Sequence, residues 1–199
     1  MDLRGGVDEA GRGPLAGPVV AAAVIFERGV HLKGIRDSKT LSARQRQDLS
    51  DLIRRLAVSW AIGAATVSEV DQYNIHQATL LAMRRAVYGL NVAPTYLYVD
   101  GTVYPDVRCP GKAVVRADQS IHVVSAASIL AKVARDSVMV AMSKEYPGYG
   151  FERHKGYPTS LHLDTLGRLG PCAIHRTSYR PVRILLEGGA VDHNCLLDQ

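Results

Sequence analysis

The chain has 199 residues, of which 47% are hydrophobic, and a formal net charge of +5. This length fits one domain or one domain with a small appendage, and the basic excess permits nucleic-acid binding without demonstrating it. The longest apolar run, 17–26, is too short to span a bilayer, and no charged-then-apolar leader is evident, so we expect a cytoplasmic protein without membrane association.

Hydrophobic periodicity predicts the secondary structure in chain order. Short apolar segments predict strands over 3–8, 19–26, 58–67, 95–100 and 112–116. The turn 11–17 joins the first two, so we expect a hairpin. Helical spacing predicts one helix after a capping box at Ser42 and Gln45, and others over 74–90, 122–144 and 159–168. An early hairpin followed by strands alternating with helices predicts an α/β fold, with a mixed central sheet covered by helices.

Four acidic residues follow predicted strands. Asp8 and Glu9 close the first, Asp100 closes the fourth and Asp118 follows the fifth. Each acid alone is typical of an ordinary turn. Together, on neighbouring strands, they would meet at one sheet edge, where clustered carboxylates repel one another unless a cation is present. Because adjacent strand residues point to opposite faces, Asp8 and Glu9 share a site only if the chain bends, as Gly11 allows. The pattern predicts two divalent ions that activate water and stabilise the leaving oxygen of a phosphodiester.

Anion-binding candidates lie beside these acids. The turn Gly11-Arg12-Gly13 brings backbone N–H groups and a guanidinium close to an anion. Lys39 is either a surface lysine or a phosphate contact, and the sequence favours neither. The segment 146–159, which contains Tyr157, interleaves aromatic, glycine and basic residues, a composition that favours a nucleic-acid groove.

Other basic residues extend these expectations. His162, His175 and Arg176 lie downstream of that segment and favour the groove, whereas the spacing of the seven histidines is not typical of a zinc site. On the long helix, Lys132 and Arg135 predict a solvated or salt-bridged face, with Asp136 one turn from Lys132.

An ordered set of segments resembles bacterial ribonuclease HII, a type 2 ribonuclease H: 6–14, 37–39, 99–101, 125–136 and 149–159. The resemblance implies a ribonuclease H-like fold with a small C-terminal helical segment. We expect a catalytic core over 1–145, a substrate-binding segment over 146–186 and a tail over 187–199. The resemblance also implies hydrolysis of RNA in RNA–DNA hybrids, and incision 5′ of ribonucleotides embedded in duplex DNA, with Mn²⁺ or Mg²⁺.

The resemblance assigns roles to individual residues. The family's four acidic metal ligands fall on Asp8, Glu9, Asp100 and Asp118. Its reader of the ribose 2′-hydroxyl, the group that separates RNA from DNA, falls on Gly11, Arg12 and Gly13. Its junction tyrosine falls on Tyr157. One departure is Arg116-Ala117-Asp118, where relatives often have Lys-Gly-Asp.

Two other functions are weighed against this interpretation. One is a non-catalytic protein that binds RNA–DNA hybrids through Lys39, Lys132, Arg135 and the segment 149–157. The other is a nuclease of the same fold that acts on DNA alone. We expect a monomer, and the tail contains no evident peptide for binding a replication clamp, so the sequence does not decide that interaction.

Overall fold

The structure is a computed structural model that describes residues 3–27, 29–35 and 41–190. Lys39 and the end of the predicted tail lie outside these residues. The strands are β1 (Arg4–Ala10), β2 (Val19–Phe26), β3 (Ser59–Ala65), β4 (Tyr96–Asp100) and β5 (Gly111–Val114). The helices are α1 (Ala43–Leu56), α2 (Val67–Tyr88), α3 (Ala117–Ser120), α4 (His122–Glu145), α5 (Phe151–His154), α6 (Ser160–Leu169) and α7 (Arg180–Leu186).

The five strands form one mixed sheet in the order β3-β2-β1-β4-β5. β2 pairs antiparallel with both β1 and β3, whereas β4 pairs parallel with both β1 and β5. The predicted hairpin and mixed sheet are therefore confirmed. β1 and β4 end at the same edge, and both carry an acidic residue there.

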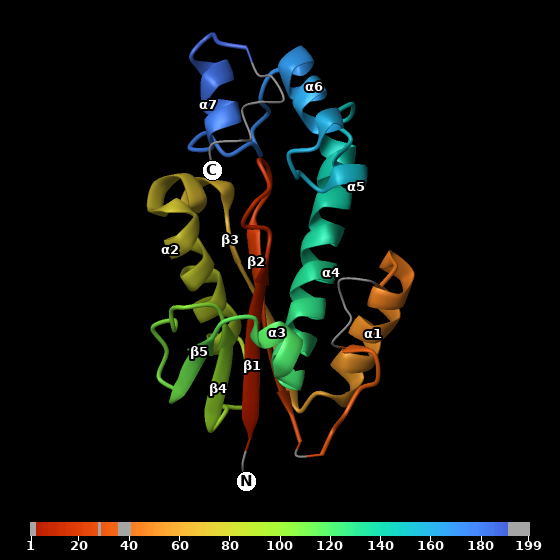
Figure 1. The fold of residues 1–199 in the computed structure, drawn as a ribbon, viewed down its shortest axis with the longest axis vertical. Helices are drawn as coiled ribbons and strands as arrows, with labels where there is room; N and C mark the ends of the chain where they lie inside the picture. The colour runs from red at the N-terminus through yellow and green to blue at the C-terminus, as the bar shows by residue number, and fades with distance from the viewer. Residues whose placement is uncertain (1–2, 28, 36–40, 191–199) are drawn as a thin grey trace.

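Helices cover both faces of the sheet (Figure 1). α2 packs on one face, and α4, backed by α1, packs on the other. All eight residues of β2 are apolar and buried, as expected for a strand covered on both sides. At Gly6 a Cβ would lie 2.4 Å from the Val123 carbonyl carbon, so glycine lets α4 approach β1 closely.

Most element boundaries agree with the sequence prediction, and α2 is the main exception. α1 has the predicted capping box at Ser42. α2 begins seven residues before Asn74, because Thr66 provides an earlier capping box with Glu69. The predicted cap at Asn74 is nonetheless present inside the helix: its φ is 67°, and its side-chain oxygen accepts hydrogen bonds from the N–H groups of His76 and Gln77. α2 is thus two helical pieces joined at a kink.

The helices α5, α6 and α7 lie together beyond one end of the sheet (Figure 1). The sequence predicted α6 but not the short α3, α5 and α7, which are too brief for a periodic apolar pattern. Leu15, from the turn after β1, packs in one apolar cluster with Leu163, Leu166 and Val182. The β1–β2 turn is therefore attached to the C-terminal segment. Within the described part of the chain, no helix is long and apolar enough to cross a membrane.

Candidate active site

Two carboxylates meet where the central parallel strands end. Val7 of β1 pairs with Val99 of β4, and both pack in the apolar cluster under α2. Because side chains alternate along a strand, the next residues, Asp8 and Asp100, face the side covered by α4. The sequence prediction that these two acids share one edge of the sheet agrees with this geometry.

Burial and mutual repulsion dominate the electrostatics of this edge. Burial raises the pKa of Asp8 well above its usual value, and the charges of Glu9 and Asp100 raise it further, while a hydrogen bond from Ser128 on α4 opposes the shift. Burial also raises the pKa of Glu9; Arg12 lowers it and Asp100 raises it. Arg12 Nη1 lies 3.5 Å from Glu9 Oε1. Glu9 therefore lies within electrostatic reach of both aspartates, despite its position next to Asp8 on the strand.

The position of Asp118 follows from a hydrogen bond between the preceding residue, Ala117, and Asp100. The Ala117 N–H donates a hydrogen bond of 2.6 Å to Asp100 Oδ1 at the start of α3. Arg116, just before, adopts a left-handed conformation with φ 55°. Asp118 is buried, and its carbonyl oxygen accepts a 2.5 Å hydrogen bond from Ser125 Oγ. The segment 116–118, where the sequence departs from the family pattern, thus donates a hydrogen bond to Asp100 and carries Asp118.

The chemistry of these donors fits a hard divalent cation. Glu9 Oε2 is buried and has no hydrogen-bond partner among the described residues. An unsatisfied carboxylate oxygen beside two further carboxylates is stabilised by a cation with oxygen ligands. Among residues 3–27, 29–35 and 41–190, no three acidic, histidine or cysteine side chains converge closely enough to hold an ion unaided.

An open cavity of about 420 Å³ reaches one of these carboxylates, that of Glu9. Its lining includes Glu9, the turn Gly11-Arg12-Gly13, Ser128, Lys132 and Tyr157. Gly11 has a φ of +100°, which favours glycine, whereas Arg12 and Gly13 are exposed. The predicted anion-binding turn and the predicted junction tyrosine therefore line one cavity.

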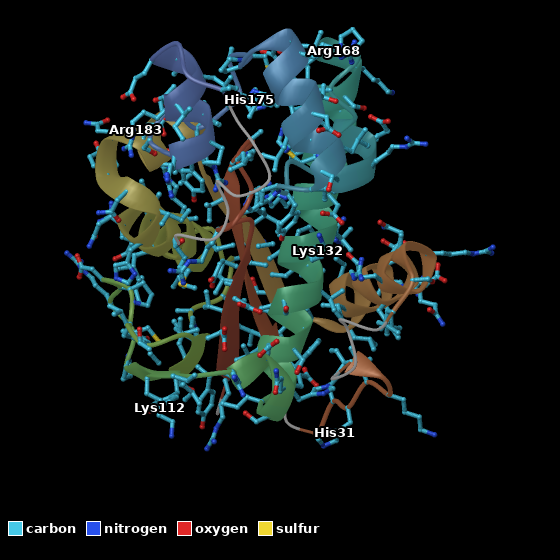
Figure 2. The ribbon with its side chains drawn as sticks, turned by 45° about the horizontal axis from the view of Figure 1, so that its top comes forward. His31, Lys112, Lys132, Arg168, His175 and Arg183 are labelled. Atoms are coloured by element: carbon cyan, nitrogen blue, oxygen red, sulfur yellow. The ribbon has the colours of Figure 1, made fainter. Side chains whose placement is uncertain are left out.

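Tyr157 contacts Lys132 through its ring and His162 through its carbonyl oxygen. Lys132 Nζ lies 5.4 Å from the centre of its ring, and Tyr157 as a whole is 37% exposed. The carbonyl oxygen of Tyr157 hydrogen-bonds His162 Nδ1 at 3.0 Å. Lys132 pairs with Asp136 at 2.8 Å, which confirms the predicted one-turn ion pair. Lys132 lies half-way along α4 (Figure 2).

The expectation for Arg135 was wrong. Its side chain is fully buried, and it donates to the carbonyl oxygens of Ala16, Pro18 and Lys155 at 3.0–3.1 Å. Burial, reinforced by the nearby charge of Arg176, lowers the pKa of Arg135 to about 10. Helical spacing places a residue on a face, but it does not reveal that a long side chain reaches the carbonyl groups of a distant turn.

Three further residues cannot line a nucleic-acid groove, because His162, His175 and Arg176 are all buried. His175 lies among the C-terminal helices (Figure 2). His162 Nε2 and His175 Nε2 are 3.1 Å apart, and the ring of His154 stacks on that of His162 at 4.2 Å. Burial lowers the pKa of His162 to about 3 and that of His175 to about 4, so both are neutral near pH 7. Of these two histidines, His162 contacts Tyr157 directly, and His175 contacts His162.

A mixed sheet of this strand order, with acidic residues at the ends of its two central parallel strands, defines a metal-dependent nuclease of the ribonuclease H-like class. A family model described as Ribonuclease HII matches residues 5–182, so the chain belongs to the ribonuclease HII family. The sequence-based recognition is confirmed. The chain is accordingly a metal-dependent endoribonuclease that hydrolyses RNA in RNA–DNA hybrids.

Similarity to individual proteins agrees with the family match. The chain is 56% identical over 182 residues to the ribonuclease HII of Nitrosococcus oceani, which covers 92% of this chain and 90% of that protein. The crystal structure of ribonuclease H2 from Pyrococcus horikoshii OT3 is 26% identical, with a TM-score of 0.80 and coverage of 94% of this chain and 98% of that one. Bst-RNase HIII in complex with Mn²⁺ shares the fold at 18% identity, with a TM-score of 0.76 and coverage of 93% and 69%.

Proposed function

We propose that Asp8, Glu9, Asp100 and Asp118 hold Mg²⁺ or Mn²⁺ at the edge of β1 and β4, and that the chain incises duplex DNA immediately 5′ of an embedded ribonucleotide. The observation that carries the metal assignment is the buried, unpartnered Glu9 Oε2 beside Asp8 and Asp100. The Mn²⁺ bound to Bst-RNase HIII, a protein of the same fold, supports the choice of ion.

Each residue has a distinct task in this proposal. Bound at these four carboxylates, the cations would supply neutralising charge and lower the pKa of a bound water. Ser128 favours the ionised form of Asp8 by donating a hydrogen bond, and the Ala117 N–H fixes the orientation of the Asp100 carboxylate. These hydrogen bonds hold the metal-binding oxygens in place before substrate arrives.

Selection of the ribonucleotide falls to the turn Gly11-Arg12-Gly13 in the same cavity. An exposed glycine such as Gly13 lets the backbone approach a ribose closely, and backbone N–H groups can bind its 2′-hydroxyl. Tyr157, from the segment 146–186, presents its ring to the sugar at the junction. Lys39 remains a predicted phosphate contact outside the described residues. The partners in this proposal are RNA–DNA hybrids and DNA duplexes that contain ribonucleotides.

Binding without catalysis is disfavoured by the same residues. A binding protein would depend on exposed basic and aromatic side chains, but Arg135 and Tyr149 are both buried. The Tyr149 hydroxyl donates a hydrogen bond to the Gly170 carbonyl oxygen. Buried carboxylates that repel one another would weaken the binding of a phosphate backbone. The acidic edge is useful only when it holds cations.

The test uses a labelled DNA duplex with one ribonucleotide, an all-DNA duplex, and Mg²⁺, Mn²⁺ or EDTA. We expect a metal-dependent nick just 5′ of the ribonucleotide and an intact all-DNA duplex. Asp100→Asn should abolish cleavage while binding persists, and the matched control Asp106→Asn, at an exposed acid of the same loop region, should cleave normally. Near-normal cleavage by Asp100→Asn would overturn the metal assignment. Cleavage of long hybrids without a nick at a single ribonucleotide would overturn the sugar assignment alone.

A further inference from the structure

The turn that lines the active-site cavity is held from behind by the C-terminal segment. Arg176 Nη2 donates to the Gly11 carbonyl oxygen at 2.6 Å, and Arg176 Nη1 donates to the Arg12 carbonyl oxygen at 2.9 Å. The hydroxyl of Tyr179 donates a second hydrogen bond, of 2.5 Å, to the Arg12 carbonyl oxygen. Arg176 Nη1 also donates to the Tyr179 hydroxyl at 2.9 Å. Two consecutive peptide groups are thus fixed by two side chains more than 160 positions away.

These hydrogen bonds determine where the N–H groups of the turn point. In a trans peptide the C=O and N–H bonds point in opposite directions. With the carbonyl groups of Gly11 and Arg12 directed at Arg176 and Tyr179, the N–H groups of Arg12 and Gly13 point away from them. No hydrogen bond to either N–H group is recorded among the described residues, and both residues are exposed in the cavity wall. Two adjacent free donors form a cradle for an oxygen atom.

The segment that carries Arg176 and Tyr179 is itself fixed by hydrogen bonds. Arg176 is fully buried, and its backbone N–H donates to the Leu15 carbonyl oxygen at 2.8 Å. The two residues after it are fixed to α2, because the Asp71 carboxylate accepts hydrogen bonds from the backbone and side chains of Thr177 and Ser178 at 2.6–3.0 Å. The turn 11–13 is therefore held by a segment that is attached to the core on both sides.

The guanidinium of Arg176 adds charge as well as geometry. Within the described ranges Arg176 forms no ion pair, and its hydrogen bonds go to backbone carbonyls and to the Tyr179 hydroxyl. A buried cation polarises the carbonyl groups that it contacts and thereby strengthens the N–H groups of the same peptides as donors. Both effects favour an oxygen ligand at the cavity face of the turn.

We propose that Arg176 and Tyr179 are positioning residues that set the ribose specificity of the enzyme by orienting the peptide groups of Gly11-Arg12-Gly13. This inference rests on the proposed sugar-reading role of that turn. Neither side chain lines the cavity. Loss of the Tyr179 hydroxyl removes one of the two hydrogen bonds to the Arg12 carbonyl oxygen, so that Arg176 alone orients the Arg12–Gly13 peptide.

The experiment measures sugar discrimination, not affinity alone. In an Asp100→Asn background with Mg²⁺, fluorescence anisotropy gives the Kd for a duplex with one ribonucleotide and for the identical all-DNA duplex. Discrimination is the Kd for the all-DNA duplex divided by the Kd for the duplex with one ribonucleotide. Tyr179→Phe should lower this ratio about fivefold, the equivalent of one hydrogen bond. The matched control is Val24→Ala, which opens a cavity in the buried cluster between β2 and α4, a cluster that contains neither Tyr179 nor any residue of the turn. It should lower thermal stability and leave the ratio unchanged.

The outcomes separate the two proposals. An unchanged ratio in Tyr179→Phe, or an equal fall in Val24→Ala, overturns the positioning role while the sugar-reading role of the turn stands. Absence of discrimination in the parent protein overturns the sugar-reading role itself, and this inference with it. A second readout is the amide ¹H–¹⁵N signals of Arg12 and Gly13, which should shift in Tyr179→Phe and in Arg176→Lys but not in Val24→Ala.

Discussion

Replacing Gly11 by alanine should damage the protein far more than the same change two residues later. Gly11 has a φ of +100°, and an added Cβ would lie 2.0 Å from Nε of the buried Arg135 and 2.9 Å from the Pro18 carbonyl oxygen. Arg135 must move, and it then loses its hydrogen bond to Pro18. Backbone strain at this φ costs about 1–2 kcal/mol, and the loss of a charged hydrogen bond costs about 1.5–3 kcal/mol. Gly11→Ala should therefore lower the free energy of unfolding by about 3–5 kcal/mol.

For a chain of this length, that loss corresponds to a fall in Tm of about 10 °C. Calorimetry or urea unfolding measures it, with Gly13→Ala as the matched control. A Cβ at Gly13 meets no atom within 4 Å, so Gly13→Ala should retain the Tm of the parent. It should still impair cleavage at a single ribonucleotide if the backbone must approach the sugar closely. Equal Tm values for Gly11→Ala and the parent would refute the claim that Arg135 is pressed against this turn.

Three further predictions concern the supports of the site. Arg135→Lys should lower the Tm by several degrees, because an ammonium group cannot reach three carbonyl oxygens in the same fork; urea unfolding measures this. Tyr157→Phe should cleave a single-ribonucleotide duplex near the normal rate and Tyr157→Ala at least tenfold slower, in single-turnover kinetics, if the ring provides the contact. Because the pKa values of His162 and His175 are lowered to about 3 and 4, the unfolded chain binds more protons below pH 6.5. Stability should therefore fall by about 1 kcal/mol per pH unit for each histidine as the pH drops below 6.5. The raised pKa of Asp8 acts in the opposite direction, so the measurement is the difference in slope between the parent and His175→Gln.

The sheet could be predicted from sequence because its signals are local. The uniformly apolar segment of β2, the capping box at Ser42 and the glycine-rich turn after β1 each depend on residues a few positions apart. The two aspartates at strand ends were equally accessible, since a strand followed by an acid is visible in sequence and a shared edge follows from strand pairing. Asp118 could be placed only through the structure, which shows the Ala117 N–H bound to Asp100.

The supports of the site could not be predicted, because they depend on contacts across the whole chain. Helical spacing predicted that Arg135 lies on a solvated or salt-bridged face, yet its side chain reaches the carbonyl groups of residues 16, 18 and 155. Composition placed His162 and Arg176 in a binding groove, yet both are buried. A basic residue in a glycine-rich region has the same sequence signature whether it meets a phosphate or a backbone carbonyl oxygen. Only the fold distinguishes these partners.

The two buried arginines explain how a loop so rich in glycine can keep the single conformation that its proposed role in reading the sugar requires. A turn with Gly11, Gly13 and Gly17 has high conformational entropy in isolation, and its backbone would sample many orientations. Arg135 and Arg176 bind carbonyl oxygens throughout 11–18 and hold it in one of them. In the proposed role, glycine allows the close approach to substrate, and the arginines provide the order that glycine lacks. Because Arg176 belongs to the C-terminal segment, changes in that segment should alter sugar discrimination even where they lie far from the carboxylates.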